Sequence, residues 1–205
     1  NSAIDIPLWQ KQKPVLDYVM ILKTQPSNNG GYKVDGRLVA VASGQTLWQK
    51  QFLDISSTDL SALGHQVADA WYENITGKRG YFQTHLAIVR HKMDQYNNWT
   101  YQLLISKYDG SNPQLILSQS EPIITPTFSP DGRSISYVSY DNSQMKVYQM
   151  DLASAKRYVL ADFQGINSAP TYAPNSKSMV MALTKGAGDQ TNLYQLNMQY
   201  GNLIA

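Results

Sequence analysis

Cysteine is absent from the 205 residues of this sequence. A chain without cysteine forms no disulfide framework, holds no thiol nucleophile and offers no thiolate to a metal ion. Long hydrophobic runs are missing as well, since no apolar stretch approaches the roughly 18 residues that a membrane-spanning helix needs. The sequence therefore predicts neither a disulfide scaffold nor a membrane span.

Charge is also scarce. Charged residues make up 16% of the chain, the net charge is +2, and the basic residues are scattered. The densest basic pairs are Lys78 with Arg79 and Lys11 with Lys13. Neither pair forms the clustered basic surface that binds nucleic acid, so we expect no nucleic-acid partner.

Residues suited to catalysis or metal binding are few. The only histidines are His65, His85 and His91, and no carboxylate cluster accompanies them, so we expect no metal site. No G-x-S-x-G sequence presents a nucleophilic serine. The glycine-rich stretch 186–188 leads into another strand, which favours a tight hairpin over a dinucleotide-binding turn. Residues 107–112 indicate a turn and lack the acidic ends of a calcium loop. We predict no catalytic residue, no cofactor and no enzymatic activity.

What the sequence does contain is a repeat. The segment 126–133 (PTFSPDGR) recurs 44 residues later as 170–177 (PTYAPNSK). Pro130, Asp131 and Gly132 have the composition of a tight turn, and Asn175 with Ser176 is a weaker version of it. A period near 40–45 residues with turn residues at one phase is typical of β-propeller blades.

Each turn is followed by a strand, a hairpin and a returning strand. Residues 135–140 alternate in hydrophobicity and residues 179–184 are almost continuously apolar, as in an inner strand covered on both faces. We predict hairpins at 141–144 and 185–189, returning strands at 147–152 and 193–198, and a weaker third copy with strands at 84–89 and 103–107. The part of the chain from residue 80 to 205 is thus predicted to be a partial all-β propeller of about two and a half blades. Because propellers close with about four to eight blades, we expect the sequence to be a fragment.

The first 79 residues predict a different, α/β domain. Strands at 15–22, 32–41 and 46–52, with a hairpin at 27–31, predict a meander. The hydrophobic period then changes to that of a helix at about 58–76, whose apolar face carries Leu60, Leu63, Val67, Trp71 and Ile75. Ser57 or Thr58 is expected to cap the start of this helix and Gly77 its end. The sequence begins with Asn and without a signal-like start, so we expect that this domain is truncated at its start and that any targeting segment has been removed.

The junction between the two parts resembles a known family. Residues 75–84 (ITGKRGYFQT) are similar to the LTGxRGxFxT junction of the TolB family, the periplasmic component of the Tol–Pal envelope system. Three further motifs follow in the order of that family: 108–112 (YDGSN), 120–132 (SEPIITPTFSPDG) and 167–170 (NSAP). The chain is identified on this resemblance as a divergent member of the family, with Ile166 where the family usually has histidine.

The resemblance implies a fold, a location and partners. It implies an α/β domain and a propeller with six blades in the full-length protein, located in the periplasm. It also implies that the propeller mouth binds the peptidoglycan-associated lipoprotein, and that TolA binds an N-terminal segment absent from this sequence. The role implied is to support outer-membrane integrity and constriction of the envelope during cell division, and we expect a monomer.

Repeat phase and resemblance together place two loops at the mouth, at 121–125 and 166–169. We expect partner contacts from Glu121, Ile123, Thr125, Ile166, Asn167, Ser168 and Ala169.

Two other functions remain open at the level of sequence. Similar blades occur in the accessory propeller of serine peptidases, whose hydrolase domain would lie outside this sequence. A sugar- or lactone-processing propeller would need metal-binding carboxylates on its inner strands, and the strands predicted here supply none.

Overall fold

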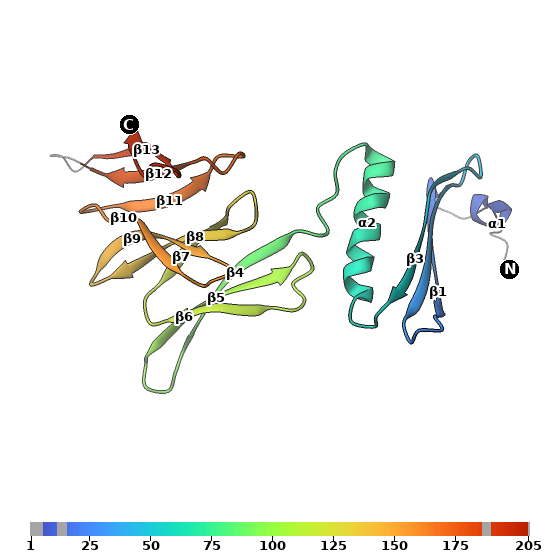
Figure 1. Cartoon of the computed structure of the whole chain (residues 1–205), viewed down its shortest axis with the longest axis horizontal. Coiled ribbons are helices and arrows are strands. Elements are labelled where there is room, and N and C mark those ends of the chain that lie inside the picture. Colours follow the sequence, from blue (N-terminus) through green and yellow to red (C-terminus); the bar gives the residue numbers. More distant parts are fainter. Residues whose placement is uncertain (1–5, 12–15, 186–189, 205) are drawn as a thin grey trace. The chain divides into compact units, whose positions relative to one another are not determined.

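The computed structural model describes residues 6–11, 16–185 and 190–204 (Figure 1). The chain divides into two compact units, Asn1–Thr84 and His85–Ala205. The sequence placed the boundary between residues 79 and 80, within the segment that connects the long helix to the second unit. In the part of the chain that the structure describes, no helix has the length and apolar character to cross a bilayer.

The first unit is an antiparallel meander with a helix packed on it, as predicted. A short helix α1 (Ile6–Gln10) precedes three strands in the order β1-β2-β3, namely β1 (Tyr18–Pro26), β2 (Tyr32–Ala40) and β3 (Thr46–Ile55). The predicted hairpin between β1 and β2 is confirmed, because the Ser27 N–H donates to the Gly31 carbonyl at 2.8 Å. Val15, at the start of the predicted first strand, lies outside the described residues.

Helix α2 (Leu60–Thr76) buries its predicted apolar face against this sheet. Leu63 and Val67 form a core with Val34 of β2, and Trp71 packs beside them. The Trp71 ring meets Trp48 of β3 edge-on, with centroids 6.1 Å apart. The Trp48 ring fits there because β2 has Gly36, where a Cβ atom would lie only 2.8 Å from that ring.

The sequence predicted the C-terminal end of α2 correctly and the cap at its N-terminal end incorrectly. The N-terminal position is Asp59, which makes no side-chain capping bond. The expectation that Ser57 or Thr58 caps the helix is therefore wrong. It is the Ser56 hydroxyl that holds this turn, donating to the Asp59 carboxylate at 2.7 Å and accepting from the Asp59 N–H at 3.2 Å. Gly77 ends the helix as predicted, with φ 69° and its N–H bonded to the Glu73 carbonyl.

Among its described residues, the second unit contains three antiparallel sheets, one of three strands and two of four (Figure 1). The first has the order β4-β5-β6, with β4 (His85–Met93), β5 (Trp99–Lys107) and β6 (Gln114–Gln119). The second has the order β10-β9-β8-β7, with β7 (Ile123–Phe128), β8 (Ser134–Asp141), β9 (Gln144–Asp151) and β10 (Arg157–Ala161). The third has the order β11-β12-β13-β14, with β11 (Asn167–Tyr172), β12 (Ser178–Thr184), β13 (Thr191–Asn197) and β14 (Leu203–Ile204).

These sheets stack as successive blades. Contacts join β4 to β7 and β7 to β11, so one edge of each sheet lies beside the same edge of the next. This arrangement makes β7 and β11 the inner strands. The prediction that 135–140 and 179–184 are the inner strands is wrong by one position, because β8 and β12 lie second in their sheets.

The second sheet shares a hydrophobic core with each of its neighbours. Ile135 and Tyr137 of β8 pack with Leu103 of the first sheet. Val138 on the opposite face of β8 packs with Met179 and other residues of the third sheet. The prediction that residues 179–184 are covered on both faces is wrong, since Val180 of β12 is 40% exposed while Met179 and Met181 are buried. It is β8, predicted to alternate, that is covered on both faces.

A polar contact ties the second and third sheets together. The Tyr172 hydroxyl at the end of β11 lies 2.6 Å from the Ser136 hydroxyl and accepts from Gln149 Nε2 at 2.9 Å. Burial raises the pKa of Tyr172, with the two hydrogen bonds opposing the rise. This hydroxyl is thus a half-buried bridge between blades whose hydrogen bonds are satisfied.

The repeated turns keep their geometry although their sequences differ. In the first, the Ser129 N–H donates to the Ser134 carbonyl at 2.9 Å and Gly132 has φ 70°. In the second, the corresponding bond joins Ala173 to Ser178, and Ser176 adopts φ 58° in place of the glycine. The predicted hairpin at 141–144 is confirmed by the pairing of Asp141 with Gln144. The one predicted at 185–189 falls almost entirely outside the described residues.

Candidate functional site

The two segments predicted to contact a partner lie at equivalent places in consecutive sheets. Each leads into an inner strand, β7 or β11, and each strand contains a proline at its centre, Pro126 or Pro170. Proline has no N–H to donate to a ladder, so it is tolerated at edge strands and bulges. The pairing register shifts at both places, and the residue before each proline has a positive φ, 49° at Thr125 and 51° at Ala169.

The prediction that these segments are loops is wrong for most of their residues. Glu121 and Ile166 precede the strands, whereas Ile123, Thr125, Asn167, Ser168 and Ala169 lie within them. The proline in each segment is typical of a loop sequence. The backbone bulges there, but the flanking residues still pair with β8 and β12.

The predicted contact residues divide into accessible and buried ones. Glu121, Thr125, Ile166 and Ala169 are exposed, and Ser168 is half-buried. Ile123 and Asn167, which occupy the same repeat phase, are 2% and 0% exposed. The buried pair can act only by holding the accessible residues in place.

Asn167 fixes the segment that precedes β11. Its Oδ1 accepts from the Phe163 N–H at 2.9 Å, and its Nδ2 donates to the carbonyls of Met145 and Phe163 at 2.9 and 2.5 Å. Met145 belongs to β9 of the neighbouring sheet, so one amide joins two blades and the turn between them.

Ile166 is held by its backbone and free at its side chain. Its N–H donates to Thr184 Oγ1 at 3.2 Å, and its carbonyl accepts from the Thr184 N–H at 2.8 Å. Gly165 beside it has φ 95°, and a Cβ there would lie 2.9 Å from the Thr184 Cβ. The side chain of Ile166, 44% exposed, is therefore an apolar group presented from a fixed backbone.

The segment before β7 is held by a residue that the sequence interpretation missed. Gln119 Nε2 donates to the Glu121 carbonyl at 3.0 Å and to the Ser139 hydroxyl of β8 at 2.6 Å. Gln119 lies 44 residues before Phe163, so the repeat period was the signal that could have found it.

Charged residues at the same end of the second sheet are paired with one another. Lys146 Nζ lies 2.8 Å from the Asp141 carboxylate and 3.1 Å from that of Asp162. Hydrogen bonds to these two carboxylates raise the pKa of Lys146. The cluster connects β8, β9 and the segment after β10.

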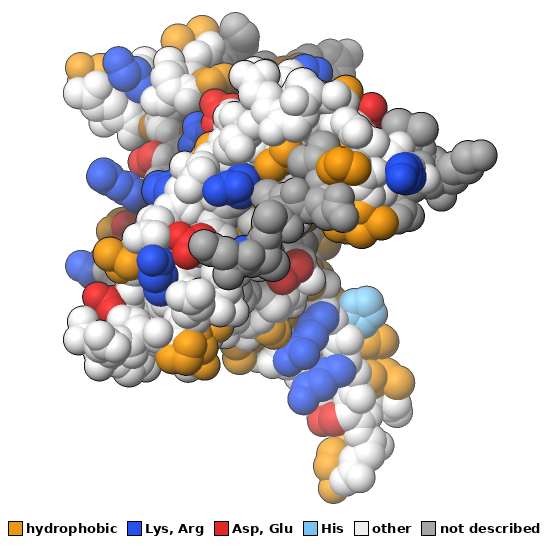
Figure 2. Space-filling model, turned by 90° about the vertical axis from the view of Figure 1, so that its right-hand side faces the viewer, with side chains coloured by type: hydrophobic (Ala, Val, Ile, Leu, Met, Phe, Trp, Pro, Cys, Tyr) orange, Lys and Arg blue, Asp and Glu red, His pale blue; other side chains and the backbone are white. Residues whose placement is uncertain are grey.

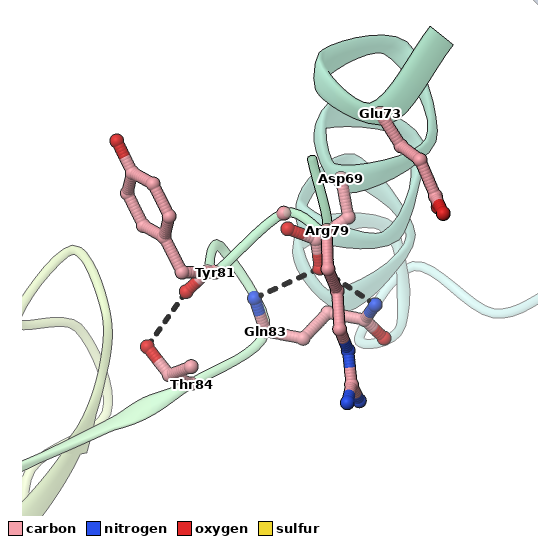
Figure 3. Close-up of a pocket in the computed structure, with 7 residues that line it drawn as sticks. Asp69, Glu73, Arg79, Tyr81, Gln83 and Thr84 are labelled. Atoms are coloured by element: carbon pink, nitrogen blue, oxygen red, sulfur yellow. Dashed lines mark hydrogen bonds between the residues drawn. The ribbon is translucent and has the colours of Figure 1, made fainter. Parts of the chain in front are cut away.

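A separate pocket lies in the first unit, against α2 (Figure 3). It has a volume of about 480 Å³ and is lined by Asp69, Glu73, Arg79, Gly80, Tyr81, Gln83 and Thr84. The Asp69 carboxylate accepts from the Phe82 N–H at 2.7 Å, the Gln83 N–H at 3.2 Å and Gln83 Nε2 at 2.7 Å. These bonds attach the segment after α2 to the helix. The Asp69 carboxylate in this pocket therefore has a structural role.

The histidines do not form a metal site in the described part of the chain. His65 is on α2, while His85 and His91 lie at opposite ends of β4. Within the described residues no three side chains of His, Asp or Glu come together as metal ligands would. The ring of His91 instead contacts those of Trp99 and Tyr101.

Comparison with known proteins gives a consistent result. A family model described as the TolB beta propeller domain matches residues 72–204. The chain is 35% identical over 193 residues to the Tol-Pal system protein TolB of Francisella tularensis subsp. mediasiatica, a match covering 93% of this chain and 44% of that protein. It is also 35% identical over 173 residues to the protein of the same name from Xylella fastidiosa strain M12, covering 82% and 38%.

A solved structure supports the same relationship. The crystal structure of TolB from Acinetobacter baumannii matches with a TM-score of 0.81 and 28% identity, covering 98% of this chain and 49% of that one. The chain thus spans about half the length, or less, of the relatives it matches. Because the family model covers most of the sequence and the sheets stack as propeller blades, the chain belongs to the TolB β-propeller family.

Proposed function

We propose that this chain is part of a non-catalytic, periplasmic protein-binding scaffold of a Tol-Pal system. Its partner at the propeller is the peptidoglycan-associated lipoprotein, and TolA is bound through an N-terminal segment. The scaffold supports outer-membrane integrity and envelope constriction during cell division. Membership of the family and the similarity to Tol-Pal system proteins support this role.

The observation that carries the proposed binding site is the repeated, fixed presentation of accessible residues. Glu121 and Ile166 precede equivalent inner strands, and the backbone of each is held by a side chain, that of Gln119 and that of Thr184 respectively. An exposed apolar side chain on a preorganised backbone loses little conformational entropy when it binds, which favours a protein contact. In this proposal Glu121, Thr125, Ile166, Ser168 and Ala169 touch the partner, while Ile123 and Asn167 position them.

The test is a binding measurement between the full-length protein and the soluble domain of the lipoprotein from the same organism. Ile166→Asp places a charge on the apolar contact, and we expect it to weaken binding by at least about 30-fold, as for a hot-spot residue. Tyr200→Asp is a matched control, because Tyr200 is 74% exposed in the turn before β14, at the opposite end of the same sheet.

The possible outcomes test the proposed function and the proposed contact surface separately. Absence of binding by the unmodified protein at micromolar concentration would overturn the proposed function. Equal binding by the unmodified protein and Ile166→Asp would overturn the assignment of the contact surface.

A further inference from the structure

The turn between β1 and β2 contains the only Asn-Gly pair in the sequence, Asn29 followed by Gly30. An asparagine side chain can react with the backbone of the residue that follows it, because that residue's nitrogen can attack the side-chain amide carbon. A Cβ atom on the following residue hinders this approach, and glycine has none. The pair therefore brings together a side-chain amide and the least hindered backbone nitrogen that a chain offers.

The fold leaves this pair accessible. Asn29 and Gly30 are both exposed, and nothing lies within 4 Å of the position that a Cβ of Gly30 would occupy. The Gly30 N–H donates to the Ser27 carbonyl at 3.2 Å, and Asn29 Nδ2 donates to Asp54 Oδ2 at 3.4 Å. Both distances are long for hydrogen bonds, and exposed turns open locally at little cost in free energy. These two bonds therefore slow the reaction of the pair without preventing it.

The turn is attached to the end of β3 through Asp54. The Ser27 hydroxyl donates to Asp54 Oδ1 at 2.5 Å, and a Cβ at Gly31 would lie only 3.0 Å from the Asp54 carbonyl carbon. The Ser27 N–H closes the hairpin by donating to the Gly31 carbonyl at 2.8 Å. In Figure 1 this turn and the end of β3 lie at the same end of the meander. A change of charge or of length in the turn therefore acts directly on Asp54.

We propose that Asn29 is a site of spontaneous deamidation in the folded protein, and that the product weakens the attachment of the turn to Asp54. The Gly30 nitrogen loses its proton and forms a bond to Asn29 Cγ, while the Cγ–Nδ2 bond breaks and the amide leaves with a proton as ammonia. Water then opens the resulting succinimide ring at one of its two carbonyl carbons. The product is aspartate or isoaspartate at residue 29, and nothing is oxidised or reduced.

The aspartate product alters the charge beside Asp54. The present contact joins an amide N–H to a carboxylate oxygen, whereas after deamidation two carboxylates face each other across the same gap. Like charges repel, and exposed charges act mainly within a screening length of about 10 Å. On the face of the molecule drawn in Figure 2, basic and acidic side chains are interspersed among polar ones. The added charge therefore acts chiefly at its contact with Asp54.

The isoaspartate product alters the length of the backbone. Its chain passes through the former side chain, which adds one carbon atom to the turn. The bond from the Ser27 N–H to the Gly31 carbonyl depends on the present spacing, and Pro26 pairs with Tyr32 just outside it. We expect the longer turn to lose this bond or the close packing of Gly31 on Asp54. Both products therefore loosen the same end of the first unit.

The experiment incubates the full-length folded protein in water enriched in heavy oxygen, which marks each opening of the ring. Peptide mass spectrometry then locates and quantifies the label. We expect Asn29 to gain label at least an order of magnitude faster than Asn142, which is exposed in the β8–β9 hairpin but precedes Ser143. Gly30→Ala is expected to slow the labelling by a similar factor. The rate at Asn29 should also rise with pH, because the attacking nitrogen must lose its proton.

Two results would overturn the site. One is equal labelling of Asn29 and Asn142. The other is an unlabelled Asn29 after the time in which the urea-unfolded chain converts half of this residue, because the fold would then protect it. If Gly30→Ala distorts the turn, the pH profile of the unmodified protein decides, and a rate independent of pH contradicts the mechanism.

The consequence of the reaction is tested separately. Asn29→Asp reproduces the aspartate product, and Asn29→Ser removes the amide without adding charge. We expect a lower midpoint of urea denaturation for Asn29→Asp than for Asn29→Ser, and a smaller difference at high salt, where the repulsion is screened. Equal midpoints at low salt would show that the turn stays attached to Asp54, and the second half of the proposal would then be wrong.

Discussion

Replacing Asn167 by alanine tests whether the buried amide holds the predicted contact surface in place. The substitution removes the acceptor of the Phe163 N–H and the donor to the carbonyls of Met145 and Phe163. The Asn167 side chain is 0% exposed, so water cannot easily replace these bonds. We therefore expect both a loss of stability and a displacement of the segment that carries Ile166.

The magnitude follows from the number of groups left without a partner. A buried polar group that loses its hydrogen bond costs about 1–3 kcal/mol. The Phe163 N–H and the Met145 carbonyl are the main groups affected, because the Phe163 carbonyl still accepts from Gln144 Nε2 at 3.2 Å. Partial relaxation of the turn reduces the sum, and we expect a loss of about 2–4 kcal/mol in the free energy of unfolding.

The assay is urea denaturation of Asn167→Ala and of the unmodified protein, followed by a binding measurement on the folded variant. Asn192→Ala is the control, since Asn192 is exposed on β13 of the same sheet and such surface changes stay within about 0.5 kcal/mol. A loss below about 1 kcal/mol for Asn167→Ala, or unchanged lipoprotein affinity, would refute the positioning role.

Three further predictions concern stability. Tyr172→Phe removes the bridge to Ser136 and Gln149 and is expected to cost about 1–2 kcal/mol in urea denaturation; an unchanged midpoint would show that the bridge is energetically neutral. Gly80→Ala would place a Cβ 2.6 Å from the Cα of Asp69 and is expected to destabilise the first unit by about 2 kcal/mol, whereas Gly64→Ala on α2, with nothing within 4 Å, should stabilise it by about 0.5–1 kcal/mol. Equal melting temperatures for these two alanine variants would contradict the packing argument. Hydrogen bonds from the Ser129 hydroxyl and then the Arg133 N–H lower the pKa of Asp131 in the folded state, so its stabilising contribution is present above the unfolded pKa near 3.8 and is lost as the pH falls through the folded pKa. Asp131→Asn should therefore lose less stability than the unmodified protein between about pH 5 and 3, and parallel pH profiles would contradict this.

The sequence predicted the blades because their turns and strands recur at a fixed period. It placed β8, β9 and the meander of the first unit correctly from alternation and turn residues alone. It did not identify 123–128 and 167–172 as strands, because the central prolines and the positive φ of Thr125 and Ala169 are loop signals locally. Only pairing with a neighbouring strand converts them into bulged edge strands, and pairing is not visible in a single segment.

The candidate site was predicted in part for a similar reason. Repeat phase located the segments around Glu121 and Ile166, but it could not distinguish an exposed residue from a buried one. Asn167 has the sequence character of a surface residue and is fully buried, because Met145 of another sheet supplies its partner.

The two-sided packing of the second sheet has a kinetic consequence. Its strands β8 and β9 contribute to the cores on both sides, so they cannot open without exposing apolar surface of a neighbouring sheet as well. Local opening free energies rise toward the global value where buried contacts are densest. Amide protons of β8 and β9 should accordingly exchange with solvent deuterium last, while those of β14 and of the hairpin at 93–99 exchange first.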